Sequence, residues 1–333
     1  MPDLQAARGC EAKYLCRRGA ARRYLVALDI DGTLLPSGTR VPQATIDAVG
    51  LVRTAGHHVV LATGRTLAST LAVAKDLGLT NEWIVASNGA VTARLENTAL
   101  GGYRLHARHT FDARPVVRLA RLRLGEVSIA TEDFGRGWLV TEPFRAGLLN
   151  GRQRVIDRHD ELWAMPTTRV VLAGPSVTSL VSSLHRLGVR ATPEGVDRVN
   201  VTADQLSKAS ALELVRAHLS VPPDDTFAIG DGVNDTEMLA WAAHGVAMGQ
   251  ADARVKAVAA SVTGSVDEQG AAGALLSLAA GQLPQPACRL LRLGQQLGAH
   301  HGPADSPGTS LPFADGNVPQ KAPLSPGEHW PAG

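Results

Sequence analysis

Short runs of consecutive apolar residues alternate with stretches of helical periodicity from Tyr24 onward. Apolar runs of this length, separated by helices, are typical of parallel strands that are buried on both faces of one sheet. They predict an α/β fold with a doubly wound, Rossmann-like parallel sheet as its core. The predicted strands are Tyr24–Ile30, Val59–Ala62, Trp83–Ala86, Thr226–Ile229 and Val246–Met248. The predicted helices run from about Pro42 to Gly56, from Thr66 to Leu77, from Ser207 to Leu219 and from Asp235 to Ala243.

The pattern changes between Asn88 and about Val199. Short stretches of alternating polarity, which are typical of strands exposed on one face, surround two helical stretches there. We therefore predict an α+β cap domain of residues 88–199, inserted into a core domain formed by residues 23–87 and 200–281. The alternating stretches are Ala90–Leu95, Val127–Thr131, Trp138–Thr141 and Val170–Ala173, and the helical ones are Asp112–Leu124 and Val177–Leu187.

The two ends of the chain differ from the rest in composition. Residues 1–22 are basic and contain no apolar stretch of the length that a secretory signal requires. Residues 282–333 are rich in Pro, Gly, His and Ser and have few apolar anchors. We predict that both segments, a basic leader and a Pro/Gly-rich tail, are disordered.

Composition narrows the class of protein further. The chain has 333 residues, 44% of them hydrophobic, which is enough for two domains with real cores. Its formal net charge of +2 gives no reason to expect a nucleic-acid partner, and no apolar run approaches the ~18 residues of a membrane helix. The three cysteines lie toward the ends, outside metal-ligand spacing, as expected in a reducing cytoplasm. We expect a cytoplasmic protein that binds neither nucleic acid nor a membrane, and its oligomeric state is left open.

Two carboxylates follow the first predicted strand. Asp29 and Asp31 are separated by one residue where the strand ends, and Gly32 permits a tight turn after them. Ligands bind at the carboxyl-terminal edge of open α/β sheets, and acidic residues are seldom buried without a cation. A strand that simply runs into an Asp-Gly turn is the plain alternative, and this stretch alone leaves it open.

A second acidic pair follows the strand predicted at Thr226–Ile229. Asp231 and Asp235 lie in a glycine-rich stretch that superficially resembles a dinucleotide-binding fingerprint. Asp235 stands where that fingerprint requires its third glycine, and its charge would repel a pyrophosphate. Four carboxylates at one sheet edge repel each other, so the sequence predicts a divalent cation that prefers oxygen ligands, with Mg²⁺ as the natural choice.

Two further positions favour a phosphate site at the same edge. Thr63 follows the strand Val59–Ala62 and is itself followed by Gly64. Lys208 stands at the start of a helix, where the helix dipole mildly disfavours a positive charge, and this placement suggests contact with phosphate. Either feature alone is ordinary turn or surface chemistry. Together with the carboxylates they predict phosphoryl transfer.

With these motifs in order, the chain resembles the haloacid dehalogenase-like (HAD) superfamily, and within it the Cof-type branch with a large inserted cap domain. The resemblance covers about Tyr24 to Leu278. It rests on DIDGTLL at residues 29–35, TGR at 63–65, the lysine of SKASAL at 207–212 and GDGVNDTEML at 230–239, with ASNGA at 86–90 and GVAMGQA at 245–251 in addition. Ala209 departs from the family pattern, which usually has glycine after the motif lysine.

The resemblance implies a Mg²⁺-dependent phosphatase that works through an aspartyl-phosphate. Asp29 would be the nucleophile, and Asp31 would protonate the leaving oxygen and then activate water. The implied metal ligands are Asp29, Asp231 and the backbone carbonyl of Asp31. The phosphoryl group would be bound by Thr63, Gly64, Lys208 and Asn234, with support from Gly32, Asn88 and Asp235.

Several alternatives share this fold. A dehalogenase would not need Asp31, a phosphomutase or phosphotransferase would keep both acids, and a non-catalytic metabolite-binding protein would have lost a motif residue. We expect a phosphatase that acts on a small phosphorylated metabolite, either a sugar phosphate or a cofactor-like phosphomonoester. The cap residues that are candidates for contact with the leaving group are Glu132, Asp133, Phe134, Arg136, Trp138, Arg145, Arg169 and Arg198. The pairs His57-His58 and His300-His301 have no further zinc ligands nearby in sequence, and we expect neither to bind metal.

Overall fold

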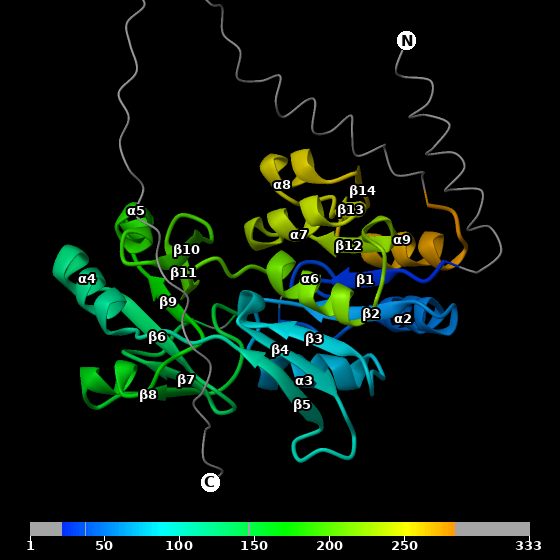
Figure 1. Ribbon diagram of the computed structural model, residues 1–333. Helices are drawn as coiled ribbons and strands as arrows, with labels where there is room; N and C mark the ends of the chain where they lie inside the picture. Colours follow the sequence, from blue (N-terminus) through cyan, green and yellow to red (C-terminus); the bar gives the residue numbers. More distant parts are fainter. Residues whose placement is uncertain (1–21, 37, 146, 284–333) are drawn as a thin grey trace, which may run out of the picture. The chain divides into compact units, whose positions relative to one another are not determined.

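The structure is a computed structural model that describes residues 22–283, apart from residues 37 and 146. Figure 1 shows the course of the chain through these residues. The predicted leader (1–22) and tail (282–333) lie almost wholly outside them. Within the described range the strands form two sheets.

The first sheet has eight strands in the order β14-β13-β12-β1-β2-β3-β4-β5. The strands from β14 to β3 run parallel, and β4 and β5 extend the sheet as antiparallel strands. Successive side chains point to opposite faces, so Leu25 and Ala27 contact one helical layer while Val26 and Leu28 contact the other. The strands are β1 Leu25–Leu28, β2 His58–Ala62, β3 Trp83–Ala86, β4 Val91–Leu95, β5 Tyr103–Arg108, β12 Thr226–Gly230, β13 His244–Ala247 and β14 Ser261–Val262.

Helices cover both faces of this sheet. Helices α2, α3 and α9 pack on one face, and α6, α7 and α8 pack on the other. The predicted α/β class with a doubly wound core is therefore confirmed. Within the part of the chain that the structure describes, no helix has both the length and the apolar character needed to cross a bilayer. The helices are α2 Gln43–Thr54, α3 Leu67–Asp76, α6 Lys208–His218, α7 Thr236–Trp241, α8 Ala253–Val258 and α9 Gly270–Ala279.

The second sheet has six strands in the order β10-β11-β9-β6-β7-β8. Its pairs are antiparallel except for β7 with β8. Helices α4 (Arg114–Leu124) and α5 (Val181–His185) pack on one face, and a smaller apolar cluster around Trp138 lies on the other. The strands are β6 Ser128–Asp133, β7 Gly137–Val140, β8 Gln153–Val155, β9 Val170–Ala173, β10 Val189–Pro193 and β11 Arg198–Ala203.

Most of the predicted elements are present, but five strands were not predicted. Strands β5, β8, β10, β11 and β14 lack a continuous apolar run; β5, for example, has no fully buried residue. The single helix predicted at Val177–Leu187 is a 3₁₀ turn at Val177–Leu180 followed by the short helix α5. Such strands are specified by backbone pairing with a neighbour, which a pattern of apolar positions does not contain.

Strand pairing also divides the sheets differently from the predicted boundaries. Strands β4 and β5 lie within residues 88–199 but belong to the first sheet, because β4 pairs with β3 across a tight turn at Ser87–Gly89. Strand β11 crosses the predicted boundary at 199–200 and belongs entirely to the second sheet. An alternating pattern shows that a strand is half-buried, but it does not show which sheet the strand joins. The division into a core and a separate cap domain stays a prediction.

Candidate active site

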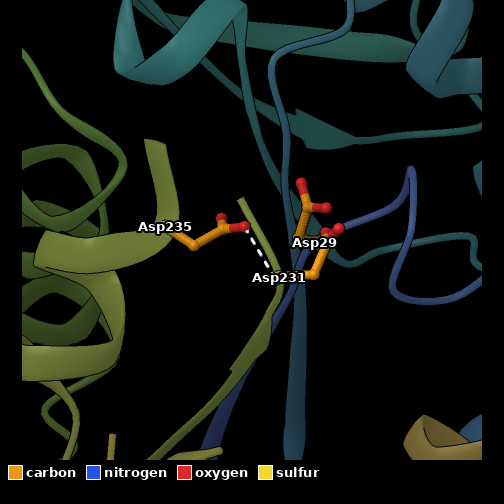
Figure 2. A group of neighbouring side chains, drawn as sticks. All are labelled: Asp29, Asp231 and Asp235. Carbon is orange, nitrogen blue, oxygen red and sulfur yellow. Dashed lines mark hydrogen bonds between the residues drawn. The ribbon is translucent and has the colours of Figure 1, made fainter. Parts of the chain in front are cut away.

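Three parallel strands bring polar residues to one edge of the first sheet. Strand β1 lies between β12 and β2, so Asp29, Thr63 and Asp231 emerge at the same edge after the last residues of their strands. The N–H of Asp29 donates to the carbonyl of Ile229 at 3.1 Å, which ties the end of β1 to β12. Figure 2 shows the carboxylates of Asp29 and Asp231 close together at this edge.

The turn after β1 has no space for a side chain at Gly32. Gly32 has a φ of +81°, and an added Cβ would lie 2.3 Å from Asp231 Oδ2. Thr33 Oγ1 donates to Asp231 Oδ1 at 3.1 Å, and Gln250 Nε2 donates to the carbonyl of Gly32 at 2.6 Å. The turn is therefore packed against Asp231 and fixes the position of that carboxylate relative to Asp29.

Three carboxylates lie together at this edge, and one ammonium group bridges two of them. Asp29, Asp231 and Asp235 each offer an oxygen, and these oxygens lie within 4.8 Å of one another. The buried Lys208 Nζ lies 2.5 Å from Asp29 Oδ1 and 2.7 Å from Asp235 Oδ1. Asp235 Oδ2 accepts hydrogen bonds from the N–H of Asp231 at 3.1 Å, dashed in Figure 2, and from the N–H of Gly232 at 2.9 Å. Asp235, predicted as a supporting residue, thus lies inside the carboxylate group.

The charges of this group do not balance among the protein side chains. Burial and the carboxylate of Asp235 raise the pKa of Asp29 well above its ordinary value, although Lys208 offsets part of the rise. Burial and Asp235 likewise raise the pKa of Asp231 to about 6. Burial alone would lower the pKa of Lys208, but the carboxylates of Asp235 and Asp29 outweigh burial, and the pKa of Lys208 is raised. Three carboxylates thus face one ammonium, and their all-oxygen donor set fits a hard divalent cation.

Asp31 lies outside this group. Arg65 forms a bidentate ion pair with its carboxylate, with Nε 2.8 Å from Oδ2 and Nη2 2.6 Å from Oδ1. Asn150 Nδ2 donates to Asp31 Oδ2 at 3.4 Å. The two neighbouring acids are therefore held by different cations, Asp29 by Lys208 and Asp31 by Arg65. This separation allows them to take different chemical roles.

A small group of neutral residues lies beside the carboxylates; its members are Thr63, Gly64, Asn88 and Asn234. Asn234 Nδ2 donates to Asn88 Oδ1 at 3.0 Å, and the N–H of Asn88 donates to the carbonyl of Thr63 at 3.1 Å. A Cβ at Gly64 would lie 3.1 Å from Asn88 Oδ1, so a side chain there would crowd that amide. Thr63, Gly64 and Asn234 line a cavity of about 410 Å³ together with Asp29. Three of the four predicted phosphate-binding positions thus border one space, and the fourth, Lys208, contacts Asp29 on its wall.

A turn of unusual backbone conformation supports Asn88. Ser87 and Asn88 have φ values of +51° and +56°, which non-glycine residues rarely adopt. Ser87 Oγ donates to Glu132 Oε2 on β6 at 2.7 Å, and both side chains are buried. Burial raises the pKa of Glu132, and Arg169 offsets part of the rise. A residue of the second sheet therefore holds the turn that carries Asn88.

Arg169, immediately before β9, makes a second contact from the second sheet. Its Nη1 donates to the carbonyl of Gly64, and its guanidinium lies 4.6 Å from the ring centroid of Trp138. Of the eight cap residues predicted as candidates, Arg169 and Arg198 are the two that line the cavity within the described ranges. Trp138 and Glu132 do not line it but contact Arg169, Trp138 through its ring and Glu132 through its N–H, which donates to the carbonyl of Arg169 at 2.9 Å.

Some contacts had no signal in the sequence. Arg65 belongs to a motif, but its partner Asp31 is separated from it by 34 residues along the chain. Asn150 lies in no pattern that suggests a role, and Ser87 lies in a stretch of the family resemblance that does not indicate its contact with Glu132. Gln250 lies in a stretch that carried part of the family resemblance, and its hydrogen bond to Gly32 spans 218 residues. Only the fold brings these residues to the site.

Of the two histidine pairs, His57-His58 lies among the described residues, at the start of β2. His57 Nδ1 accepts a hydrogen bond from the N–H of Tyr24 at 3.2 Å, and the two rings meet edge to face. His300-His301 lies outside the described residues. Over residues 22–283, apart from 37 and 146, the one group of three or more metal-ligating side chains is Asp29, Asp231 and Asp235.

Comparison with known proteins identifies one family. A family model described as haloacid dehalogenase-like hydrolase matches residues 26–113 and 178–275. The matched segments contain every residue predicted for catalysis and for binding of the metal and the phosphoryl group. They leave out residues 114–177, which hold strands β6 to β9.

The similar proteins include named phosphatases. The chain is 28% identical over 263 residues to 5-amino-6-(5-phospho-D-ribitylamino)uracil phosphatase YitU of Bacillus subtilis. This alignment covers 75% of this chain and 95% of that protein. It is 27% identical over 249 residues to the HMP-PP phosphatase of Serratia proteamaculans, covering 70% of this chain and 86% of that one. A solved structure of a HAD-superfamily phosphatase from Bacteroides thetaiotaomicron aligns with a TM-score of 0.64 at 28% identity, over 78% of this chain and 96% of that one.

Proposed function

The chain belongs to the haloacid dehalogenase-like hydrolase family and is a phosphatase, and from this premise we propose that it hydrolyses small phosphorylated metabolites with Mg²⁺ through an aspartyl-phosphate on Asp29. The observation that carries the proposal is the bridge that Lys208 makes between Asp29 and Asp235, with Asp231 beside it. This arrangement gives a buried carboxylate a fixed cation while it faces a cavity large enough for a phosphate ester.

Asp29 acts as the nucleophile in this proposal. Lys208 engages its Oδ1, so Oδ2 attacks phosphorus, and the bond between phosphorus and the leaving oxygen breaks. Lys208 and the amide of Asn234 offset the negative charge on the transferring phosphoryl group. Thr63 and Gly64, which border the same cavity, orient the phosphoryl oxygens.

Asp31 acts as the proton carrier. It gives its proton to the leaving oxygen as that bond breaks, and its carboxylate then takes a proton from the water that attacks the aspartyl-phosphate. The second step frees inorganic phosphate and restores the Asp29 carboxylate and the Asp31 acid. Arg65 and Asn150 hold the Asp31 oxygens and act as positioning residues.

Mg²⁺ would be held by Asp29, Asp231 and the backbone carbonyl of Asp31. Burial and the nearby carboxylate of Asp235 raise the pKa values of Asp29 and Asp231, and a divalent cation would favour the ionised forms of both. When bound, the metal neutralises charge on the carboxylates and on the phosphoryl group.

A phosphomutase is the second candidate, since it would use the same Asp29 and Asp31 chemistry but return the phosphoryl group to another hydroxyl. A non-catalytic binding protein is less well supported, because all ten predicted site positions keep functional residues around one sheet edge.

Turnover of p-nitrophenyl phosphate tests the proposal. Activity should require Mg²⁺, vanish in excess EDTA and return when Mg²⁺ is added back, whereas Ca²⁺ should substitute poorly because it prefers more ligands at longer distances. Undiminished turnover in excess chelator would overturn the metal assignment. Conversion of a sugar phosphate to an isomer without release of phosphate would favour the phosphomutase.

We also propose that the enzyme acts in the cytoplasm on free metabolites, with neither nucleic acid nor a membrane as partner. The low cysteine content and the small net charge support this. Fractionation of cells that express the full chain should recover phosphatase activity with the cytosol, and recovery with the membrane fraction would contradict it.

A further inference from the structure

The second sheet presents two different faces. On β9 and β11 one set of alternate residues packs toward α4 and α5, namely Val170, Leu172, Val199 and Val201. The other set points to the opposite face, where Asn200 lies across the ladder from Val171. This opposite face lines the cavity that contains Asp29, through Arg169, Val171, Arg198 and Asn200. Two guanidinium groups therefore face the site from a sheet whose other side is apolar.

The charge of Arg169 is only partly matched by its surroundings. The residue is 6% exposed, its Nη1 donates to the carbonyl of Gly64, and its buried Nε has no hydrogen-bond partner among the described residues. Burial lowers the pKa of Arg169; the carboxylates of Glu132 and Glu194 offset part of this, and the guanidinium of Arg198 adds to it.

Arg198 is in a similar situation. Its Nη2 lies 2.8 Å from Glu194 Oε2, and its Nη1 donates to the carbonyl of Leu148 at 3.3 Å. Its Nε is buried and, within the part of the chain described, has no hydrogen-bond partner. Glu194 is thus the one carboxylate on the cavity wall that serves two guanidinium groups. An anion bound between Arg169 and Arg198 would accept charge-assisted hydrogen bonds from both guanidinium groups.

The remaining wall restricts the rest of the ligand. Within the described ranges no side chain that lines the cavity is aromatic, so a flat heterocycle has no ring to stack on. Asn150 and Asn200 offer amides, which pair well with hydroxyl groups. The volume of about 410 Å³ has to hold the phosphoryl group and the leaving group together, which favours a small leaving group.

We propose that the leaving group is a small, non-aromatic polyol or sugar that carries a second anionic group, either a carboxylate or a further phosphate, bound by Arg169 and Arg198. The inference rests on the proposed phosphatase function, because the reacting phosphate is taken to lie at Asp29. Arg198 is then a residue that determines substrate specificity. Arg169 both binds the anion and holds the carbonyl of Gly64.

Two matched pairs of substrates test this inference. One pair is 6-phosphogluconate and glucose 6-phosphate, and the other is fructose 1,6-bisphosphate and fructose 6-phosphate. In the presence of Mg²⁺, kcat/KM should be about 10–100-fold higher for the anionic member of at least one pair, as expected for a hydrogen-bonded charge. The pair that responds identifies the anion as a carboxylate or a phosphate. Ratios near one in both pairs, or a clear preference for pyridoxal 5′-phosphate, would overturn the inference.

Variants assign the preference to Arg198. Arg198→Gln should bring the ratio of kcat/KM values within the responsive pair close to one. Arg198→Lys keeps the positive charge but loses the planar, bidentate guanidinium, so it should give an intermediate ratio. Arg136→Gln changes an arginine whose side chain is 83% exposed and which does not line the cavity, so it should keep the wild-type ratio. An unchanged ratio in Arg198→Gln or Arg198→Lys would contradict the assignment.

Binding separates this inference from the proposed function. Calorimetric titration of the Asp29→Asn protein with 6-phosphogluconate and glucose 6-phosphate, and with the fructose pair, measures recognition without turnover. Tighter binding of an anionic member supports the inference even if wild type proves unable to hydrolyse p-nitrophenyl phosphate, which would overturn the proposed function alone. Hydrolysis of that ester with equal binding of both members in each pair would overturn the inference alone.

Discussion

Gly32 and Asp231 occupy adjoining space at the edge of the first sheet. A Cβ at Gly32 would lie 2.3 Å from Asp231 Oδ2, and the φ of +81° disfavours any side chain. Gly32→Ala should therefore lower the free energy of unfolding by about 1–3 kcal/mol and displace Asp231, so that kcat/KM for p-nitrophenyl phosphate falls by about 10²-fold or more. Urea denaturation and steady-state kinetics measure the two effects.

Gly78→Ala is the matched control for this prediction. Gly78 has a φ of +66°, and nothing lies within 4 Å of the place where its Cβ would be. Its substitution should cost stability through backbone strain but leave turnover close to that of wild type. If both alanine variants are equally active, the contact between Gly32 and Asp231 does not shape the site.

The residues at the strand ends are the part of the site that the sequence could predict. Asp29, Thr63 and Asp231 follow apolar runs, and the carboxyl ends of parallel strands meet at one edge, so pattern and topology agree. The partners of these residues could not be predicted in the same way. The pair of Arg65 with Asp31 joins two separate loops, and periodicity contains no information on how loops approach each other.

At the scale of secondary-structure elements, the contact between β6 and the turn after β3 joins the two sheets. The sequence predicted strands near both, but it could not show that Glu132 on β6 reaches Ser87, 45 residues earlier. Even the sheet to which β4 belongs depends on its backbone pairing with β3 rather than on its own residues.

The buried Glu132 makes stability depend on pH. Its pKa is raised above the ordinary value of 4.5 by burial, although Arg169, immediately before β9, and the hydroxyls of Ser87 and Thr168 act in the opposite direction. Folding therefore favours the protonated form, so this contribution to stability is present below the ordinary pKa and is lost as pH rises through the folded value. Glu132→Gln keeps an acceptor for Ser87 and removes the titration. The variant should gain stability relative to wild type as pH rises from about 4.5 toward 7.

Urea denaturation of both proteins at several pH values measures this difference. Glu126→Gln, at an exposed position, controls for the loss of one negative charge. A difference between Glu132→Gln and wild type that does not change with pH would show that Glu132 keeps its ordinary pKa in the folded protein.

At the scale of the whole molecule, the apolar clusters of both sheets are formed by residues between Tyr24 and Leu283. Every predicted site residue lies within the same range. A protein that consists of residues 22–283 should therefore fold with a Tm within a few degrees of that of the full chain, and its kcat/KM for p-nitrophenyl phosphate should be unchanged. Calorimetry and kinetics check both. Insoluble or inactive protein would show that the removed ends contribute to the fold or to the site.

In the proposed mechanism Asp29 receives the phosphoryl group and Asp31 carries the proton. p-Nitrophenolate leaves without protonation, so Asp31→Asn should still allow this ester to phosphorylate Asp29, while water attack lacks its base and the aspartyl-phosphate accumulates. Esters of sugars, whose leaving groups need a proton, should slow by about 10²–10⁴-fold in that variant.

Intact mass spectrometry of acid-quenched protein after mixing with p-nitrophenyl phosphate and Mg²⁺ is the most direct measurement. Asp31→Asn should carry one added phosphoryl group, and Asp29→Asn should carry none. An adduct on Asp29→Asn, or the absence of an adduct from both variants together with equal loss of all substrates, would contradict the assignment of the two acids.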